Sequence, residues 1–598
     1  MHSDGSETYV STLAPELGEH VTVFVQTRRA RRVLVRTVAD GEPGFVEAVP
    51  DRTAGAVTWW RAELLVRNPV TRYRFLVDGP AGPRWLNQLG TFDHDVPDAA
   101  DFRLVTDEPP PAWLRDAVIY EIFPDRFARS PAADQRELPD WAIRCDWDTP
   151  VIGRGPETPF QWYGGDLDGI AGRLDHLATL GVNTVYLRPF FPARSNHRYD
   201  AAAFDRVDPL LGGDAALGRL AAAVHGRGWR LIGDLTTNHC GDAHPWFTAA
   251  ASDVAAPERA MFYFDETGDY ESWWGVKSLP KFNWGSAELR RRFFAGPDAV
   301  ATRWLQPSLL DGWRVDVGNM TGRRGADDYT YEVAALMRAA VRDARPDGLL
   351  IAEHTHDFTA DLDRGGWHGA WNQAGFLRPV WSWLRAADCD LPDFLGIPGG
   401  VPRRPGQAAM ATMRAFAAQV SWRSYAACWT LLGSFDTPRI RTVVGDPARG
   451  EVAAGLLATM PGPPMICAGD ELGLRGVNGE DSRTPMPWHQ PETWDTRTLA
   501  YYRDLLALRQ ARPALRQGGL RWLHADADAL VYAREAPAET VLVLARRAPG
   551  APIRLPAELT GRTGMANVYG GAPELVADRS GSLTLPGDGP TFQVWATD

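Results

Sequence analysis

Apolar and polar side chains alternate with a period of two through much of residues 20–79, as in the run VTVFV at residues 21–25. Alternation of this kind is typical of β-strands that bury one face. Residues 107–111 (DEPPP) are stiff and polar and cannot continue a strand. The pattern therefore predicts an N-terminal β-sandwich domain over residues 1–110.

Short apolar runs alternate with helical periodicity from residue 111 onward. The helical spacing of apolar residues predicts helices over residues 168–180, 214–225 and 496–515. The apolar runs predict eight buried strands, at residues 117–123, 184–189, 230–236, 312–317, 349–353, 370–376, 428–433 and 464–468. Eight βα units suggest a (β/α)8 TIM barrel with insertions over residues 111–515, rather than a doubly wound sheet.

Two further segments complete the predicted fold. A long stretch separates the third and fourth predicted strands, and we expect residues 240–285 within it to form a small inserted subdomain over the barrel mouth. Beyond Gly518 and Gly519 the period of two returns, which predicts a C-terminal β-sandwich domain over residues 516–598. The expected fold class is thus α/β, a TIM barrel flanked by two β-sandwich domains.

Charge and composition argue against several classes of function. Lys and Arg number 63 against 75 Asp and Glu, a net charge of −12, and there is no dense basic run beyond residues 28–32. Nucleic acids and anionic membranes are therefore poor partners. The five cysteines are scattered, without a zinc motif, and no apolar stretch approaches 18 residues. We expect a cytoplasmic enzyme with no nucleic-acid or membrane partner.

Polar side chains gather at the carboxyl ends of the predicted strands, where a TIM barrel builds its active site. They are Asp234 and His239 on and after the third strand, Arg314 and Asp316 on the fourth, Glu353 on the fifth and Asp436 after the seventh. Two converging carboxyl groups suit the cleavage of glycosidic bonds, because one protonates the leaving oxygen while the other attacks the anomeric carbon. In retaining enzymes the two groups lie about 5 Å apart.

Four motifs in order along the chain resemble the α-amylase family of glycoside hydrolases, family 13. They are GDLTTNH at residues 233–239, GWRVD at 312–316, IAEHTHD at 351–357 and LLGSFDTPR at 431–439. Supporting stretches are YEIFPDRF at 120–127, YGGDLDGI at 163–170, SNHRYD at 195–200 and LPKFN at 279–283. The likeness is greatest to the branch of cyclomaltodextrinases, neopullulanases and maltogenic amylases.

The resemblance implies a retaining hydrolase that cleaves short, cyclic or branched α-glucans, such as cyclodextrins, pullulan fragments, maltodextrins or cyclic maltosyl-maltose. It makes Asp316 the nucleophile, Glu353 the acid and then the base, and Asp436 the stabiliser of the transition state. Arg314 lies two residues before Asp316 on the same strand face, where it would keep the nucleophile ionised and oriented. Glu353 must be protonated at rest, so we expect a setting that raises its pKa.

The resemblance also implies a set of substrate contacts. Tyr199 is the expected aromatic platform under the sugar, and His197, Asp200 and His239 are expected polar contacts. The inserted subdomain adds Trp274 as a stacking residue. Tryptophans cluster there and again in residues 367–383, and we expect both segments to wall a sugar-binding cleft, whereas Trp304 and Trp313 belong to the core.

Three positions depart from the family pattern and bear on substrate binding. Phe435 replaces the usual histidine before Asp436, and its ring cannot donate the hydrogen bond which that histidine gives to the sugar. Met320 and His354 replace residues that are often Glu and Trp near the acceptor site. Two alternatives to hydrolysis stay open, a transglycosylase with the same covalent intermediate and a non-catalytic sugar-binding paralogue.

Cofactors and partners follow from the same reasoning. We expect no required cofactor and no transition-metal site, because the His, Cys and Asp residues lack zinc spacing. The calcium loop of the relatives would fall at residues 128–138 (ARSPAADQREL), where few hard oxygens occur, so calcium is allowed but not expected. The expected partner is an oligosaccharide substrate, and the relatives suggest a homodimer.

Overall fold

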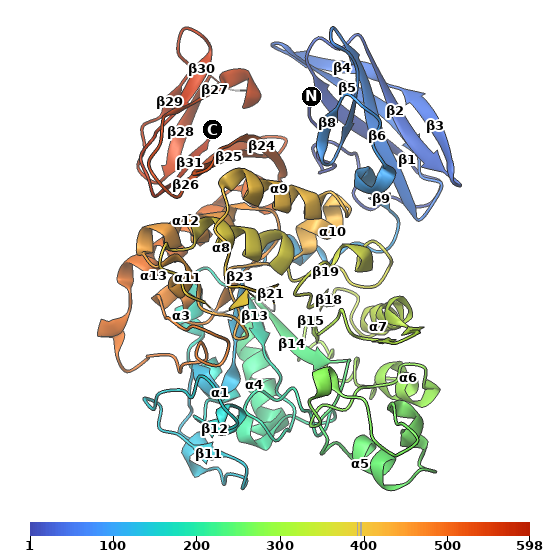
Figure 1. The fold of residues 1–598 in the computed structure, drawn as a ribbon, viewed down its shortest axis with the longest axis vertical. Coiled ribbons are helices and arrows are strands. Elements are labelled where there is room, and N and C mark those ends of the chain that lie inside the picture. The colour runs from blue at the N-terminus through green and yellow to red at the C-terminus, as the bar shows by residue number, and fades with distance from the viewer. Residues whose placement is uncertain (392, 395–396, 562, 598) are drawn as a thin grey trace.

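Eight parallel strands form the central sheet of the chain in a computed structural model that describes residues 1–391, 393–394, 397–561 and 563–597 (Figure 1). They are β10 (Ile119–Ile122), β13 (Thr184–Leu187), β14 (Arg230–Thr236), β15 (Gly312–Asp316), β18 (Leu349–Ala352), β19 (Gly369–Ala370), β22 (Thr430–Leu431) and β23 (Pro464–Cys467). Their order along the sheet is β19-β18-β15-β14-β13-β10-β23-β22, and a parallel bridge from Trp371 to Trp429 joins its two ends. The sheet therefore closes on itself, and the predicted TIM barrel is confirmed.

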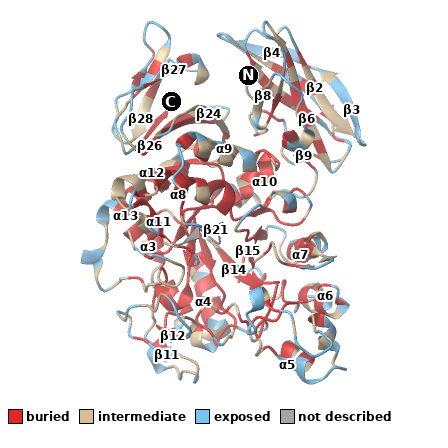
Figure 2. Cartoon of the chain, in the orientation of Figure 1, coloured by how far each residue is buried: buried red, intermediate tan, exposed pale blue. Residues whose placement is uncertain are grey.

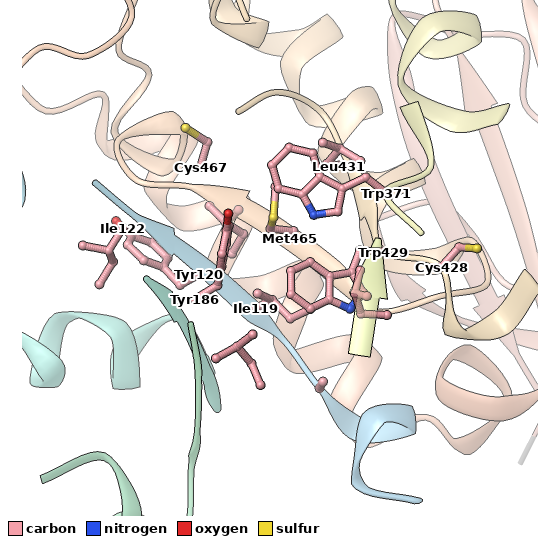
Figure 3. Close-up of a cluster of buried hydrophobic side chains, with 14 of the residues drawn as sticks. Ile119, Tyr120, Ile122, Tyr186, Trp371, Cys428, Trp429, Leu431, Met465 and Cys467 are labelled. Carbon is pink, nitrogen blue, oxygen red and sulfur yellow. The ribbon is translucent and has the colours of Figure 1, made fainter. Parts of the chain in front are cut away.

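The barrel strands are almost wholly buried, as parallel sheets covered by helices are. All four residues of β10, of β13, of β18 and of β23 are buried, and burial is concentrated in the barrel (Figure 2). Figure 3 shows side chains from several strands gathered in one cluster, among them Tyr120, Tyr186, Trp371, Trp429 and Met465. The centre of the barrel is thus a packed core, and the chemistry has to occur at its mouth.

Two of the predicted helices are each broken into a pair. Residues 168–180 form α2 (Leu167–Ala171) and α3 (Leu174–Thr179), since the chain leaves helical geometry at Arg173. Residues 496–515 form α13 (Thr496–Ala511) and α14 (Pro513–Gln517), because a proline lacks the N–H that would continue the first helix. The third predicted helix is α4 (Gly213–His225), as expected.

The sixth strand is shorter than predicted. β19 ends at Ala370, and the chain turns into the π-helical segment η9 (Gln373–Leu377) and then α8 (Arg378–Leu384). Every residue of η9 is buried. An apolar run in a buried helix cannot be distinguished from a buried strand by periodicity alone, and this ambiguity explains the error at residues 371–376.

The long connection from β14 to β15 includes residues 240–285, which we predict to form an inserted subdomain. It contains α5 (Pro245–Ser252), the 3-10 turns η6 (Pro257–Met261) and η7 (Trp273–Gly275), and α6 (Ala287–Phe294). Its core is aromatic, with the rings of Phe247, Phe262 and Phe282 in edge or tilted contact. A backbone bond from the N–H of Phe282 to the carbonyl of Asn238 (2.9 Å) ties the insertion to the end of β14.

The remaining helices lie in the segments that connect consecutive barrel strands. They are α1 (Pro124–Phe127), α7 (Thr330–Ala344), α9 (Gly406–Ala417), α10 (Trp422–Ala427), α11 (Ile440–Val444) and α12 (Pro447–Thr459). Short two-residue strands pair in loops: β11 (Ile143–Arg144) with β12 (Gln161–Trp162), β16 (Arg323–Arg324) with β17 (Asp327–Asp328), and β20 (Asp393–Phe394) with β21 (Ile397–Pro398). No helix in the described ranges is long and apolar enough to cross a membrane.

Two antiparallel sheets precede the barrel. One contains β1 (His20–Thr27), β5 (Val57–Leu65) and β4 (Val49–Ala54). The other contains β3 (Glu42–Glu47), β2 (Arg32–Ala39), β6 (Val70–Gly79), β7 (Gly82–Asn87) and β8 (Gly90–Phe92), with β9 (Phe102–Val105) also on β6. Alternate residues of both sheets pack into a separate apolar cluster, which gives the sandwich expected from their period of two.

A second set of sheets follows the barrel. Its larger sheet contains β24 (Gly519–Ala525), β25 (Ala529–Glu535), β26 (Thr540–Arg546), β31 (Thr591–Ala596), β28 (Gly564–Tyr569) and β29 (Leu575–Val576). The smaller contains β27 (Ile553–Pro556) and β30 (Ser582–Leu585). The N- and C-terminal sheets lie at the same end of the molecule, away from α5 and the insertion (Figure 1). The division we propose at residues 110 and 515 falls between these sheets and the barrel.

Candidate active site

The acidic residues of the predicted site come from adjacent strands of the barrel. In the β14–β15 register, Asp234 is paired with Arg314 and Thr236 with Asp316. Glu353 directly follows β18, the next strand in the sheet. Since all eight strands are parallel, their carboxyl ends share one mouth, where these side chains meet.

The guanidinium of Arg314 is the centre of the site. It is fully buried, and its Nη1 lies 2.9 Å from both oxygens of Asp234 and 2.9 Å from Oδ1 of Asp316. Its Nη2 lies 2.7 Å from Oε1 of Glu353. The ring of Trp371 supports its face, 4.4 Å from Cζ. One cation therefore holds three carboxyl groups together.

Asp234 holds Arg314 in place and does not reach the open mouth. Its side chain is fully buried, and the hydroxyls of Tyr186 and Tyr199 both donate to its Oδ2. With Arg314 on the same carboxyl, its oxygens are already engaged. The sugar contact expected at Asp234 stays a prediction, and the side chain is enclosed by these partners.

The surroundings of Asp316 raise its pKa well above the usual value for an aspartate. Burial is the largest cause, and the nearby carboxyl groups of Glu353 and Asp234 add to it, whereas Arg314 opposes it. Arg314 thus lowers the pKa of Asp316, as predicted. Its effect is smaller than the combined effect of burial and the two neighbouring acids. The raised pKa favours the protonated form of Asp316.

Glu353 is fixed from two sides. Its Oε1 contacts Arg314, and its Oε2 accepts the backbone N–H of Val317 at 2.9 Å. Val317 has a φ of 37°, a left-handed conformation that a β-branched residue rarely adopts. Strain of this kind often occurs at functional sites, and here it directs an N–H group at the carboxyl group of Glu353. The raised pKa expected for Glu353 stays a prediction.

Asp436 lies between two arginines. Arg188, at the end of β13, donates from Nη2 to Oδ2 of Asp436, and Nη2 of Arg483 donates to its Oδ1 at 2.9 Å. The side chain is 39% exposed, unlike those of the other acids. Burial opposes ionisation, but the two arginines outweigh it and hold the pKa of Asp436 well below its usual range. Asp436 is therefore an ionised carboxylate that solvent can reach.

The loop after β13 contains the predicted platform. Tyr199 is partly exposed, and its ring stacks on that of His197 at a centroid distance of 5.8 Å. Burial and the charge of Arg483 lower the pKa of His197 to about 3, so this imidazole is neutral. Asp200 accepts the Ser195 hydroxyl and orders the loop. The sugar contacts of these residues stay predictions.

His239 lies where the insertion meets β14. Its backbone bridges to Lys281, and the ring of Trp273 is 6.2 Å away. Burial and Lys281 lower the pKa of His239 to about 3, and its Nε2 is buried without a hydrogen-bond partner among the described residues. Because Nδ1 of His239 accepts from the amide of Asn238 at 3.1 Å, the ring proton is on Nε2, which can donate a hydrogen bond to a ligand. Lys281 also donates to the carbonyl of Met320 at 3.1 Å, which places partly exposed Met320 beside it.

Two predicted contacts are placed differently. His354 is fully buried, with Nε2 3.5 Å from Oδ2 of Asp361, and its expected contact on the acceptor side stays a prediction. Trp274 is 80% exposed at a φ of 52°, at the surface of the insertion, and its stacking on sugar stays a prediction.

The second tryptophan cluster is core, because Trp367, Trp371, Trp381 and Trp383 are at most 3% exposed. Trp304 and Trp313 are buried, as expected.

Comparison with known proteins identifies the family. Residues 121–364 match the catalytic domain of alpha amylase. A cyclomaltodextrinase from Geobacillus thermopakistaniensis is 30% identical over 530 residues, which cover 85% of this chain and 83% of that protein. The chain belongs to the α-amylase family. As a member of the α-amylase family, it is a glycoside hydrolase.

Other members of the α-amylase family support this placement. Neopullulanase 2 from Thermoactinomyces vulgaris is 29% identical over 435 residues, covering 71% of this chain and 67% of that protein. Among solved structures, a cyclomaltodextrinase gives a TM-score of 0.73 at 23% identity, covering 99% of both chains, a likeness of fold. The cyclic α-maltosyl-(1→6)-maltose hydrolase from Arthrobacter globiformis gives a TM-score of 0.67 at 28% identity, covering 82% of this chain and 99% of that one.

Phe435 is the clearest departure from the α-amylase family pattern. Its side chain is 2% exposed, and its ring meets that of Phe123 edge to face at 5.5 Å. The guanidinium of Arg439 covers it, with Cζ 5.4 Å from the ring centroid. Phe435 is therefore part of an apolar support under the loop, and its effect on substrate binding stays a prediction.

The sequence motifs missed two arginines of this site, whereas Trp273 and Trp371 belong to the two tryptophan clusters predicted to line it. Arg188 is in the stretch TVYLRP that ends the second predicted strand, so the rule about strand ends could have found it. Arg483 carries no such signal, because it lies in a loop after the last barrel strand. In the described part of the chain, no group of three His, Cys, Asp or Glu residues could hold a metal ion.

Proposed function

We propose that this glycoside hydrolase is a retaining enzyme that cleaves α-glucosidic bonds in short, cyclic or branched α-glucans. The observation that carries the proposal is the sharing of Arg314 by Asp316 and Glu353, at 2.9 and 2.7 Å. Two carboxyl groups on one guanidinium lie close enough for the separation of about 5 Å that retaining enzymes use.

In the first step Asp316 attacks the anomeric carbon. A bond forms between its carboxylate oxygen and C1 while the glycosidic bond breaks, and Glu353 gives its proton to the departing oxygen. In the second step Glu353 takes a proton from water, whose oxygen displaces Asp316 from C1. The sugar leaves with its original anomeric configuration.

Two acids have to change before the first step. Glu353 contacts Arg314 and the N–H of Val317, so the substrate must draw its carboxyl group away from these groups to reach the glycosidic oxygen. Burial and the neighbouring acids raise the pKa of Asp316, so this carboxyl group has to lose its proton before attack. Asp436, ionised between Arg188 and Arg483, is suited to binding sugar hydroxyls as positive charge develops at C1.

The relatives support the substrate class. The names of the similar proteins include cyclomaltodextrinase, neopullulanase and a hydrolase of cyclic maltosyl-maltose. We therefore expect cyclodextrins, pullulan, maltodextrins or cyclic maltosyl-maltose as substrates. We also propose that the protein acts in the cytoplasm without a required cofactor, and that it forms a homodimer.

A substrate panel tests this proposal. The enzyme is incubated with cyclodextrins, pullulan, starch and maltotriose, and the products are separated by chromatography. We expect hydrolysis of at least one substrate and a loss of activity in Asp316→Asn. Elongated products at high acceptor concentration would favour the transglycosylase, and wild-type binding without turnover would favour the sugar-binding paralogue. Unchanged activity in Asp316→Asn would contradict the mechanism.

A further inference from the structure

Arg188 has an unusual set of neighbours for a fully buried cation. Its guanidinium donates to Asp436, and its Nη1 lies 3.4 Å from Oε1 of the equally buried Glu121 on β10. Its Cζ is 5.1 Å from the centroid of the Tyr199 ring. Arg188 thus touches a site carboxylate, a second acid behind it and the expected sugar platform.

The place of Arg188 matters because Phe435, the residue before Asp436, cannot donate a hydrogen bond to its carboxylate, and the Ser434 hydroxyl on the same loop accepts from the Asp436 backbone N–H instead. The Phe435 ring is packed against Phe123 and offers no hydrogen-bond donor. Its backbone carbonyl accepts Nε of Arg483 at 2.9 Å, which fixes the loop while Arg483 also holds Asp436. The donors to Asp436 therefore come from β13 and from the segment after β23.

We propose that Arg188 is a positioning residue for Asp436, and that with Arg483 it supplies the donor and the positive charge that Phe435 cannot. This inference rests on the proposed function, because it assumes that Asp436 stabilises the transition state. A buried guanidinium is suited to the task, since it stays charged at every working pH and its planar fork fixes a carboxylate in one orientation.

Several charged groups face Asp436 and set how it titrates. They are Arg188 from β13, Arg483 and its partner Glu480 from the segment after β23, Glu121 from β10, Arg314 from β15 and His197 from the loop after β13. Burial raises the pKa of Glu121 to about 7. Below this pH Glu121 is neutral and does not compete with Asp436 for the charge of Arg188. Removing Arg188 leaves Asp436 with one contacting arginine, so its pKa rises.

The inference is tested by measuring the kinetics of Arg188→Met, Arg188→Lys and a matched control over a range of pH. We expect Arg188→Met to lower kcat by about 10²-fold, as the loss of one preorganised donor does, and to move the acid limb of kcat/KM to higher pH. Arg188→Lys should show a smaller shift of the same sign. Introducing Phe435→His into Arg188→Met should restore part of kcat, while the same change in the wild type should bring no gain.

Arg439→Met is the control. Arg439 is also a buried arginine that contacts the Phe435 ring, but its carboxylate partner is Asp470, at 2.9 Å. Its removal should lower stability and leave the acid limb where it is. An unchanged limb in Arg188→Met, or a uniform loss of activity that Phe435→His does not rescue, would overturn the inference. If Arg188→Met does not fold, Arg188→Lys decides. A shift of its acid limb to higher pH supports the inference, and an unchanged limb overturns it. A wild type inactive on every α-glucan would instead refute the proposed function.

Discussion

A single buried cation organises the acids of this site at the scale of residues. Arg314 contacts Asp234, Asp316 and Glu353, and it rests on Trp371. Burial beside two further acids raises the pKa of Asp316 despite the charge of Arg314. A retaining mechanism needs Asp316 ionised for attack, so we expect substrate binding to remove its proton.

Buried histidines make the stability of the protein depend on pH. Burial, Arg292 and Arg206 lower the pKa of His244 to about 3, below its usual value near 6.5. Between these values the unfolded chain binds a proton that the folded chain does not, so this histidine reduces the free energy of unfolding as the pH falls. The destabilisation begins near pH 6.5 and grows down to about pH 3.

His244→Asn tests this effect. In the wild type the backbone N–H of Trp246 donates to Nδ1 of His244 at 3.1 Å, and asparagine retains an acceptor for this bond. We expect the stability of the variant relative to the wild type to improve as the pH is lowered from 7 to 4.5, by up to about 1.4 kcal/mol per pH unit. Denaturant unfolding at several pH values measures it. A difference between the two proteins that does not vary with pH would contradict the assignment.

The three acids with motif signals and Arg314 could be predicted from the sequence, whereas the meeting of Arg188 and Arg483 at Asp436 could not. Family motifs place Asp316, Glu353 and Asp436 at or just after the carboxyl ends of predicted strands. Because those strands are parallel, the three side chains are expected to lie at the same end of the barrel. Arg188 and Arg483 lie 295 positions apart in the numbering and meet only at Asp436 in the folded chain. The burial of His354 could not be predicted either, because the sequence around it shows no pattern that distinguishes a core histidine from a surface histidine.

At the scale of elements, the strands were predicted better than the helix ends. Strands such as β14 are short apolar runs between turn residues, and their limits follow from that pattern. The breaks at Arg173 and before Pro513 interrupt helices whose apolar spacing continues across them. Residues 371–376 were misassigned because a buried π-helical turn has the same apolar composition as a strand.

Close packing of a helix on the C-terminal sheet gives a prediction at this scale. A Cβ on Gly455 of α12 would lie 2.4 Å from the ring of Phe592 in β31. We therefore expect Gly455→Ala to lower the free energy of unfolding by about 1–3 kcal/mol, because overpacking forces the helix and sheet apart. Gly218→Ala on α4 is the matched control, since nothing lies within 4 Å of its added Cβ. Denaturant unfolding compares them.

The control should be neutral or more stable by up to about 1 kcal/mol, because alanine favours helix over glycine. Equal effects of Gly455→Ala and Gly218→Ala would show that α12 does not pack closely on the C-terminal sheet.

At the scale of the whole molecule, the barrel is held to both flanking sheets by polar contacts that the sequence could not reveal. Arg423 of α10 donates to the carbonyl of Asp107 at 2.8 Å, and Arg547 donates to the carbonyl of Trp383 at 2.7 Å. Tyr9 donates to Glu535 at 3.2 Å between the two terminal regions. These pairs join segments far apart in sequence, where periodicity carries no information.

Stability of the whole molecule is expected to be independent of divalent metal. Asp166, in the GDLDG stretch, already accepts from Ser130, Gly169 and Arg136, which leaves little carboxylate for calcium. Dialysis against a chelator should change neither the melting temperature nor the activity. A drop in melting temperature that added calcium reverses would contradict this expectation.

The covalent intermediate on Asp316 is the most direct test of the central claim. Glu353→Gln removes the acid and base, but α-maltosyl fluoride needs no acid to release fluoride, so the first step proceeds and the second stalls. Intact-protein mass spectrometry after rapid quenching should show one added maltosyl group, and peptide mapping should place it on Asp316. An adduct on another residue, or none while fluoride is released, would contradict the account.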